Sequence, residues 1–285
     1  MQVQKRRKTH KRVSLLGRLL AILPVCILFY PLWLAAQLRL ETKTIWSEKL
    51  PVAFDGLTIA YASDIHYGTF FSRERVNDLV KKLNALNADI IVLGGDYGQD
   101  SAGALEFFQI MPPLKARLCV LGVVGNHDRT VPDSRLTDLM TAMRQAGVTP
   151  LVNDAVMLKK DGKAIALCGA DDFYNGFPDL EAIQRKTRGA DYTVFLPHTP
   201  DFLPDMDSYF FDLALCGHTH GGQITFFGRA LYSSSNYGNR YLSGWKKEKG
   251  ADILISNGVG TSVLPVRLGA APQYHLITLK SGTAS

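Results

Sequence analysis

The sequence predicts an α/β fold, a mixed two-sheet sandwich flanked by helices and preceded by one apolar segment. From residue 57 onward, short apolar runs alternate with helical patterns, which is the order typical of α/β domains. The number of runs favours two sheets over one. Of the 285 residues, 46% are hydrophobic and 20% charged, so the chain can bury a core and is neither disordered nor collagen-like.

In the first part of the predicted domain, apolar runs bounded by turn residues indicate strands, and apolar residues spaced three or four apart indicate helices. Gly147 follows the last of these helices and marks its end. The predicted strands cover residues 57–62, 89–93 and 118–124, and the predicted helices cover residues 76–86, 105–111 and 134–146.

The second part of the domain is predicted to be richer in strands. Asp161-Gly162, between apolar runs at 156–158 and 164–168, is a hairpin signal. Two further strands are predicted at 192–196 and 213–216. The last third is expected to form antiparallel strands, which cover residues 223–227, 252–256 and 274–279.

The net charge of +6 comes from 32 Lys and Arg against 26 Asp and Glu. Residues 1–18 contain seven of these bases and no acid, so the other 267 residues hold 25 bases and 26 acids. The body of the protein is therefore not basic, and we expect no nucleic-acid partner. No obligate protein partner is evident.

Residues 19–38 form an uncharged, apolar stretch of 20 residues. As a helix rising about 1.5 Å per residue, it would reach about 30 Å, the thickness of a bilayer core. We therefore expect a basic cytoplasmic tail at 1–18, a membrane anchor at 19–38, a connector at 39–56 and the main folded domain at 57–285. The charge rule predicts a single-pass protein of the cell (inner) membrane, with the bilayer as partner and the domain on the exterior face.

Three alternatives to a retained anchor stay open. A cleaved secretory signal usually has a shorter apolar region and a small-x-small site, and Leu34-Ala35-Ala36 matches that pattern poorly. A buried core helix is seldom apolar on all sides. The basic residues could also hold an interfacial helix against anionic lipid.

Polar motifs follow five of the predicted strands, at the edge where α/β sheets bind ligands. Five of the seven histidines lie in these turns, beside carboxylate and amide side chains, and this donor set indicates transition-metal binding. The motifs are Asp64-Ile65-His66, Gly94-Gly95-Asp96, Gly125-Asn126-His127-Asp128, His198 and Gly217-His218-Thr219-His220-Gly221-Gly222.

Taken in order, these motifs resemble the calcineurin-like metallophosphoesterase superfamily over about residues 57–225. The apolar segment and Gly-His-Thr-His-Gly-Gly-Gln at 217–223 resemble its bacterial membrane-associated phosphodiesterase branch of the YkuE/YaeI type. The resemblance implies a metallophosphoesterase-like fold and two metal ions. One ion is expected on Asp64, His66, Asp96 and His220, and the other on Asp96, Asn126, His198 and His218, with His127 as the catalytic acid.

The donor set suits Mn, Fe, Zn or Ni, and the sequence does not choose among them. The resemblance implies hydrolysis of a phosphate ester, favouring a diester, by attack of a metal-bridging hydroxide. The substrate is expected to be a small-molecule or lipid-linked phosphate. Two alternatives stay open: a pyrophosphatase acting on a nucleotide-linked or lipid-linked substrate such as a lipid A precursor, and a non-catalytic metal-binding scaffold. Asp128 is expected either to orient His127 or to cap the next turn.

Overall fold

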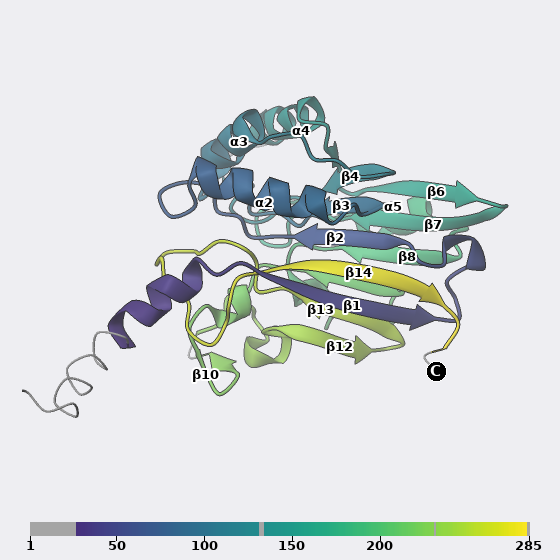
Figure 1. Cartoon of the computed structure of the whole chain (residues 1–285). Helices are drawn as coiled ribbons and strands as arrows, with labels where there is room; N and C mark the ends of the chain where they lie inside the picture. Colours follow the sequence, from purple (N-terminus) through teal and green to yellow (C-terminus); the bar gives the residue numbers. More distant parts are fainter. Residues whose placement is uncertain (1–26, 131–133, 231, 284–285) are drawn as a thin grey trace, which may run out of the picture.

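Two mixed six-stranded sheets pack face to face in the computed structural model, which describes residues 27–130, 134–230 and 232–283 (Figure 1). The first sheet has the order β1 (Arg39–Ser47), β14 (Gln273–Ser281), β2 (Thr58–Ala62), β3 (Ile90–Leu93), β4 (Cys119–Gly122) and β5 (Thr149–Pro150). The second has the order β12 (Gly244–Glu248), β13 (Ala251–Ile255), β9 (Leu213–Cys216), β8 (Tyr192–Leu196), β7 (Lys163–Gly169) and β6 (Asp154–Lys160). The two-sheet α/β architecture predicted from the sequence is therefore confirmed.

The side chains of β2 point alternately to the two faces of the first sheet, and each face packs against a different part of the core. Ile59 and Tyr61 point into the core between the sheets, where they join residues of the second sheet such as Leu167. Ala60 and Ala62 point to the opposite face, which packs against the helices. The helices on that face are α2 (Arg73–Ala85), α3 (Ser101–Ile110) and α4 (Ser134–Gln145).

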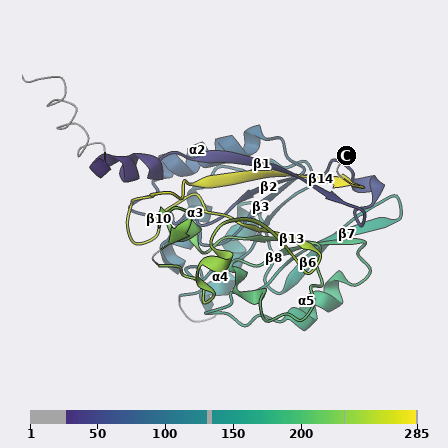
Figure 2. The same cartoon turned by 90° about the horizontal axis from the view of Figure 1, so that it is seen from below.

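The outer face of the second sheet has its own core. Ile183 of α5 (Leu180–Thr187) packs there with Phe195 of β8 and Ile253 of β13. Seen from below, α5 lies beside β6 and β7, and α2 lies on the far side of β1 and β14 (Figure 2). The molecule is thus layered as helices, sheet, sheet and helix, so both sheets are buried on two faces.

Local sequence accounts for most of these elements. In α2, Val76, Leu79, Val80 and Leu83 are buried at helical spacing, as the pattern predicts. The hairpin of β6 and β7 turns through Asp161 and Gly162, whose φ angles of 52° and 70° fit the two-residue turn that such a dipeptide favours.

The last third of the chain differs from the predicted antiparallel arrangement. β13 pairs antiparallel with β12 but parallel with β9, and β14 pairs antiparallel with β2 but parallel with β1. Residues 223–227, predicted as one strand, contribute only β10 (Thr225–Phe226), which pairs with β11 (Arg229–Ala230). Alternation along a strand indicates which side chains are buried, but it does not indicate which strand lies beside it.

Residues 39–56, expected to be a connector, contain an edge strand of the first sheet. β1 pairs with β14 from Arg39 to Ser47, and the 3-10 helix η1 (Val52–Phe54) follows. Ile45, Leu50 and Phe54 are buried in the core between the sheets. This segment is therefore part of the packed body, although its alternating polar residues did not indicate a strand.

The predicted single-pass membrane localisation is corrected by the structure. Among residues 27–130, 134–230 and 232–283, no helix is both long and apolar enough to cross a bilayer. The described helical stretch ahead of β1 covers residues 27–35, which at about 1.5 Å per residue spans less than half of a bilayer core. Its end is fixed on the body, because Leu34 and Ala35 are buried and the Pro31 carbonyl accepts a hydrogen bond from the Arg267 backbone N–H (2.9 Å). The remainder of the predicted anchor, 19–26, and the tail at 1–18 lie outside the described residues.

Candidate metal centre

The predicted site residues all follow the carboxyl ends of strands in the two sheets. Asp64 and His66 follow β2, Asp96 follows β3, and Asn126 and His127 follow β4. From the second sheet, His198 follows β8, and His218 and His220 follow β9. β2, β3 and β4 run parallel to one another, as do β8 and β9, so the turns of each sheet meet at one edge.

The backbone of these turns is left-handed at five of the site residues. Asp64, His66, Asp96, His218 and His220 have φ angles between 50° and 69°. Such angles are uncommon for residues other than glycine and carry a conformational cost. Residues with such angles cluster at functional sites. A residue in the left-handed region interrupts the extended conformation of the strand. Its side chain therefore does not have to follow the alternation of the strand and can point towards the other site residues.

Asp64, His66 and His220 form the first group of candidate ligands. The Nε2 atoms of His66 and His220 are 3.0 Å apart, and His220 Nε2 is 3.6 Å from Asp64 Oδ1. Two buried imidazole nitrogens that face each other at this distance have the geometry of ligands converging on one ion.

Asp96, His198 and His218 form the second group. His198 Nε2 is 3.2 Å from Asp96 Oδ2, and His218 Nδ1 is 2.8 Å from Asn126 Oδ1, so the amide oxygen converges with the imidazole nitrogens. Asp96 Oδ2 is also 3.6 Å from His66 Nε2 in the first group. The structure therefore brings all seven predicted ligands together and places Asp96 between the two groups.

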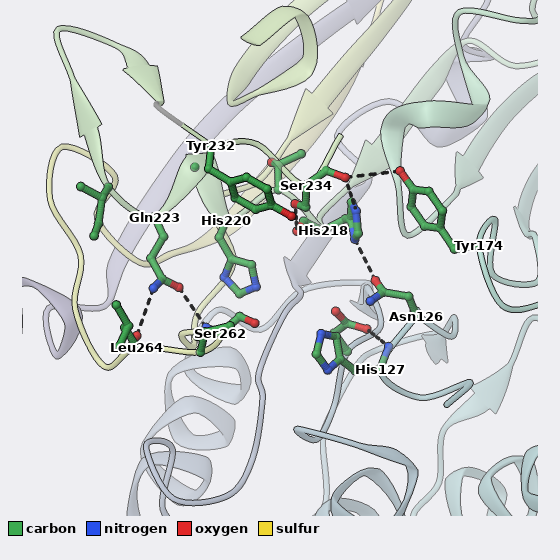
Figure 3. Close-up of a pocket in the computed structure, with 15 residues that line it drawn as sticks. Asn126, His127, Tyr174, His218, His220, Gln223, Tyr232, Ser234, Ser262 and Leu264 are labelled. Carbon is green, nitrogen blue, oxygen red and sulfur yellow. Dashed lines mark hydrogen bonds between the residues drawn. The ribbon is translucent and has the colours of Figure 1, made fainter. Parts of the chain in front are cut away.

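Hydrogen bonds on the far side of the rings fix which nitrogen faces the site. His198 Nδ1 is 2.8 Å from the Gly94 carbonyl, which leaves Nε2 directed at Asp96. His218 Nε2 is 3.2 Å from the Ser234 carbonyl, which leaves Nδ1 directed at Asn126 (Figure 3). The two rings thus offer opposite nitrogens to the same group.

Burial keeps most of these histidines neutral. It lowers the pKa of His66 to about 3 and of His218 to about 4, and it lowers the pKa of His220 well below its usual value. A neutral imidazole has a lone pair to donate, so these three rings are in the form that binds a metal.

The carboxylates, in contrast, attract positive charge into the site. Burial, with repulsion from Asp96, raises the pKa of Asp64 to about 6. Burial opposes a charged His198, yet Asp96 and Asp64 raise the pKa of that ring to about 10. His198 Nε2 is buried and has no hydrogen-bond partner among the described residues. Because buried negative charge is costly without a counter-charge, a divalent cation between these donors fits the site.

His127 lies against both groups, and with His66 and Asp96 it forms a third cluster of possible metal ligands. Its Nδ1 is 2.8 Å from the Gln99 carbonyl, and its ring makes an edge contact with His66 at 4.7 Å between centroids. The Gln99 carbonyl can only accept a hydrogen bond, so Nδ1 carries a proton and Nε2 is the atom free to exchange one. Its expected role as the acid is a prediction that this geometry allows.

Asp128 was expected either to orient His127 or to cap the next turn. Its carboxylate instead accepts hydrogen bonds from the backbone N–H groups of Gly125, Asp96 and Tyr97 at 2.8–2.9 Å. Asp128 therefore joins the turn after β4 to the turn after β3.

A cavity of about 840 Å³ opens beside these groups and is lined by Asp96, Asn126, His127, His218 and His220 (Figure 3). Gln223, the last residue of the motif at 217–223, also lines it. Sequence reasoning missed other lining residues, among them Tyr174, Ile224, Tyr232, Val263 and Leu264. The last three lie well beyond the motifs in the sequence, and no local pattern marks them.

Arg267 is a second residue that the motifs did not reveal. Its side chain is fully buried and donates hydrogen bonds to the carbonyls of His220 (2.8 Å), Asn257 (2.8 Å) and Gly260. Burial lowers the pKa of Arg267 to about 9. Its guanidinium also lies 3.1 Å from His220 Nδ1. Through these contacts Arg267 holds the turn after β9 against the loop that follows β13.

The fold and the ordered donor set define a class of protein. Residues 57–222 match the family model described as calcineurin-like phosphoesterase, which covers more than half of the chain. The chain belongs to this family and is a metal-dependent phosphoesterase.

Curated relatives place the chain within the family. YkuE of Bacillus subtilis (strain 168), an uncharacterized metallophosphoesterase, is 32% identical over 246 residues that cover 84% of each chain. An uncharacterized metallophosphoesterase of Aquifex aeolicus is 30% identical, covering 85% of this chain and 92% of that one. The phosphodiesterase YaeI of Escherichia coli (strain K12) is 28% identical, covering 78% of this chain and 81% of its own. The predicted superfamily and its YkuE/YaeI branch are thereby confirmed.

Proposed function

We propose that this protein is a phosphodiesterase that holds two divalent metal ions at the carboxyl edges of its sheets. Asp64, His66 and His220 would hold one ion, and Asn126, His198 and His218 the other, with Asp96 shared between them. The observation that carries the proposal is the position of Asp96, whose Oδ2 lies 3.6 Å from His66 Nε2 and 3.2 Å from His198 Nε2.

Two such ions would polarise the phosphoryl oxygens, balance the charge of the phosphate and lower the pKa of a water molecule. The protein's own residues would do the rest. Water would add to phosphorus and release one proton to the solvent, while the bond from phosphorus to the leaving oxygen breaks. That oxygen would take a proton from His127 Nε2, and His127 would regain a proton from the solvent, so the net reaction consumes one water molecule. The hydrogen bond from His127 Nδ1 to Gln99 holds the ring in position for this transfer.

The charge of the cavity favours a diester over a pyrophosphate or a monoester. Among the described residues that line the cavity, none is Lys or Arg. A second phosphate group, or the second negative charge of a monoester, would therefore have no side-chain cation beside it there. A phosphodiester carries one negative charge, and the name of the relative YaeI points the same way.

A comparison of three substrates tests this proposal. The purified protein, supplied with Mn²⁺, is given bis(p-nitrophenyl) phosphate, p-nitrophenyl phosphate and a nucleoside diphosphate ester. We expect kcat/KM to be at least about ten-fold higher for the diester, which corresponds to about 1.4 kcal/mol. A preference for the pyrophosphate bond would favour the pyrophosphatase alternative, and turnover of none of the three would favour a metal-binding scaffold.

A further inference from the structure

The lining of the cavity beside the candidate metal centre has two chemically different parts. One part is the polar candidate ligands Asp96, Asn126, His218 and His220. The other part is apolar and consists of Ile224 and of Tyr232, Val263 and Leu264; the last three are named here the apolar wall. At about 840 Å³, the cavity is in the upper part of the range that holds drug-sized ligands, so a phosphate group fills only part of it.

The apolar wall is exposed in a way that the fold does not require. Tyr232 is 80% exposed, Val263 83% and Leu264 52%. These side chains gain little from burial in the folded protein. Neighbouring exposed apolar side chains that border a cavity are typical of a binding surface.

Val263 is also held in an unfavourable backbone conformation. Its φ angle is 63°, in the left-handed region that a β-branched residue very seldom adopts. Glycine would occupy this position without that cost. Because an exposed valine here returns no packing energy to the fold, its side chain is better explained by contact with a ligand.

The apolar wall is tied directly to the turn that carries the ligands. Gln223 follows that turn, and its side chain spans the loop around Val263. Gln223 Nε2 donates to the Leu264 carbonyl (3.0 Å), and Gln223 Oε1 accepts from the Ser262 N–H (2.9 Å) (Figure 3). These two hydrogen bonds hold the loop that carries Val263 and Leu264 against the turn of His218 and His220.

We infer that the substrate is a phosphodiester in which one ester group is a hydrocarbon chain that packs on Tyr232, Val263 and Leu264. This inference rests on the proposed function and adds the class of substrate to it. The phosphate lies at the metal centre, and the chain extends along the apolar wall. The lack of Lys or Arg among the described lining residues fits an uncharged substituent.

A series of p-nitrophenyl alkyl phosphodiesters tests the inference. The alkyl group is ethyl, butyl or octyl, each used below its micelle concentration, and the release of p-nitrophenol is measured with the full chain and Mn²⁺. We expect kcat/KM to rise about ten-fold or more from ethyl to octyl, since methylene groups in an apolar pocket contribute to binding.

Val263→Ser should lower the octyl-to-ethyl ratio about five-fold, because the hydroxyl packs poorly against a hydrocarbon. The matched control is Val52→Ser, since Val52 is equally exposed (80%) but lies in η1 and does not line the cavity. This control should keep the wild-type ratio. Val263→Gly should also lower the ratio even though it relieves the left-handed backbone, which a purely structural role for Val263 does not predict.

The outcomes separate the two proposals. Hydrolysis of the ethyl ester with no dependence on chain length would overturn the hydrocarbon inference and leave the phosphodiesterase proposal standing. No hydrolysis of any ester in the series would overturn the phosphodiesterase proposal itself. A chain-length dependence that survives both Val263 substitutions would show that the chain does not pack on this wall.

Discussion

The Asp96 carboxylate lies 3.6 Å from His66 in the first group and 3.2 Å from His198 in the second, so its charge should matter more than its shape. Asp96→Asn keeps the volume and removes the charge, and we expect it to lose bound metal and to lower turnover by more than about 100-fold. Metal content by mass spectrometry and kcat on an aryl phosphodiester measure both effects. Asp138→Asn on the exposed face of α4 is the control and should change neither. Full metal content in Asp96→Asn would refute the shared position.

His127 should behave differently from the ligands. His127 clusters with His66 and Asp96, yet we expect it to act as the proton donor and not as a ligand. His127→Ala should therefore leave metal content near the wild-type level and lower kcat by about 10²–10⁴. The loss should shrink for esters with a more acidic leaving group, which needs less protonation. If His127→Ala instead loses one equivalent of metal, His127 is a ligand and not the acid.

His275 makes the folded protein sensitive to acid at a point away from the metal centre. Burial lowers its pKa to about 4, and its Nε2 is 2.9 Å from Ser256 Oγ. The unfolded chain, with a histidine pKa near 6.5, binds this proton first, so stability is lost as the pH falls below about 6.5. From pH 7 to pH 5 the loss is about 2 kcal/mol.

His275→Gln should remove this part of the acid sensitivity, because the amide cannot titrate. Urea unfolding of the wild type and of His275→Gln at pH 7 and pH 5 measures how much stability each protein loses. The candidate metal ligands are the same in both proteins, so their titration does not contribute to the difference between them. Equal losses of stability between the two pH values would show that His275 does not contribute.

At the scale of elements, the turn after β4 must pass close to the turn after β3. A Cβ on Gly125 would lie 2.2 Å from Asp96 Oδ1 and 2.8 Å from His198 Cδ2, so Gly125→Ala should displace the ligands and abolish turnover. Gly147→Ala is the control, since its φ is 79° but nothing lies within 4 Å of the new methyl group. It should cost about 1 kcal/mol of stability and keep the metal. Turnover near the wild-type level in Gly125→Ala would contradict this geometry.

β1 is the element whose loss should be most costly. A chain that begins at residue 57 lacks β1 and the buried Ile45, Leu50 and Phe54, and it leaves β14 as an open edge. At about 1.5–3 kcal/mol for each buried side chain, this removes much of the stability of a typical domain. We expect this chain to unfold or aggregate at 37 °C, while a chain that begins at residue 27 melts cooperatively by circular dichroism. Equal melting temperatures would show that β1 is dispensable.

The elements also show how far the sequence predicts the structure. β8 and β9 have the predicted bounds, because each is a continuous apolar run between turn residues. β1 was missed, because its first six residues are exposed and most of them are polar. The partners of β13 and β14 could not be predicted, because pairing depends on the course of the whole chain.

The same contrast holds within the site. His218 and His220 stand out because their motif is contiguous and bracketed by glycines. Arg267 has no such signal, because its role depends on a contact with His220, 47 residues earlier in the chain. Val263 has none either, because its neighbours Ser262 and Leu264 are held by Gln223 from a distant part of the sequence. The candidate ligands are thus readable from local sequence, whereas the lining of the cavity depends on tertiary structure.

At the scale of the whole molecule, both sheets contribute residues to the candidate metal centre. The first sheet contributes Asp64, His66, Asp96 and Asn126, and the second contributes His198, His218 and His220. Because each group of candidate ligands draws on both sheets, bound metal should also tie the sheets together. The packing of the core between the sheets and the occupancy of the site should therefore be coupled.

The most direct measurement is the dependence of turnover on bound metal. The protein is stripped with a chelator, dialysed and titrated with Mn²⁺, while bound metal and the hydrolysis of bis(p-nitrophenyl) phosphate are followed together. We expect no turnover in the stripped protein and recovery that is complete at two equivalents per chain. Full turnover in the metal-free protein would contradict a metal-dependent phosphodiesterase with two ions at Asp96.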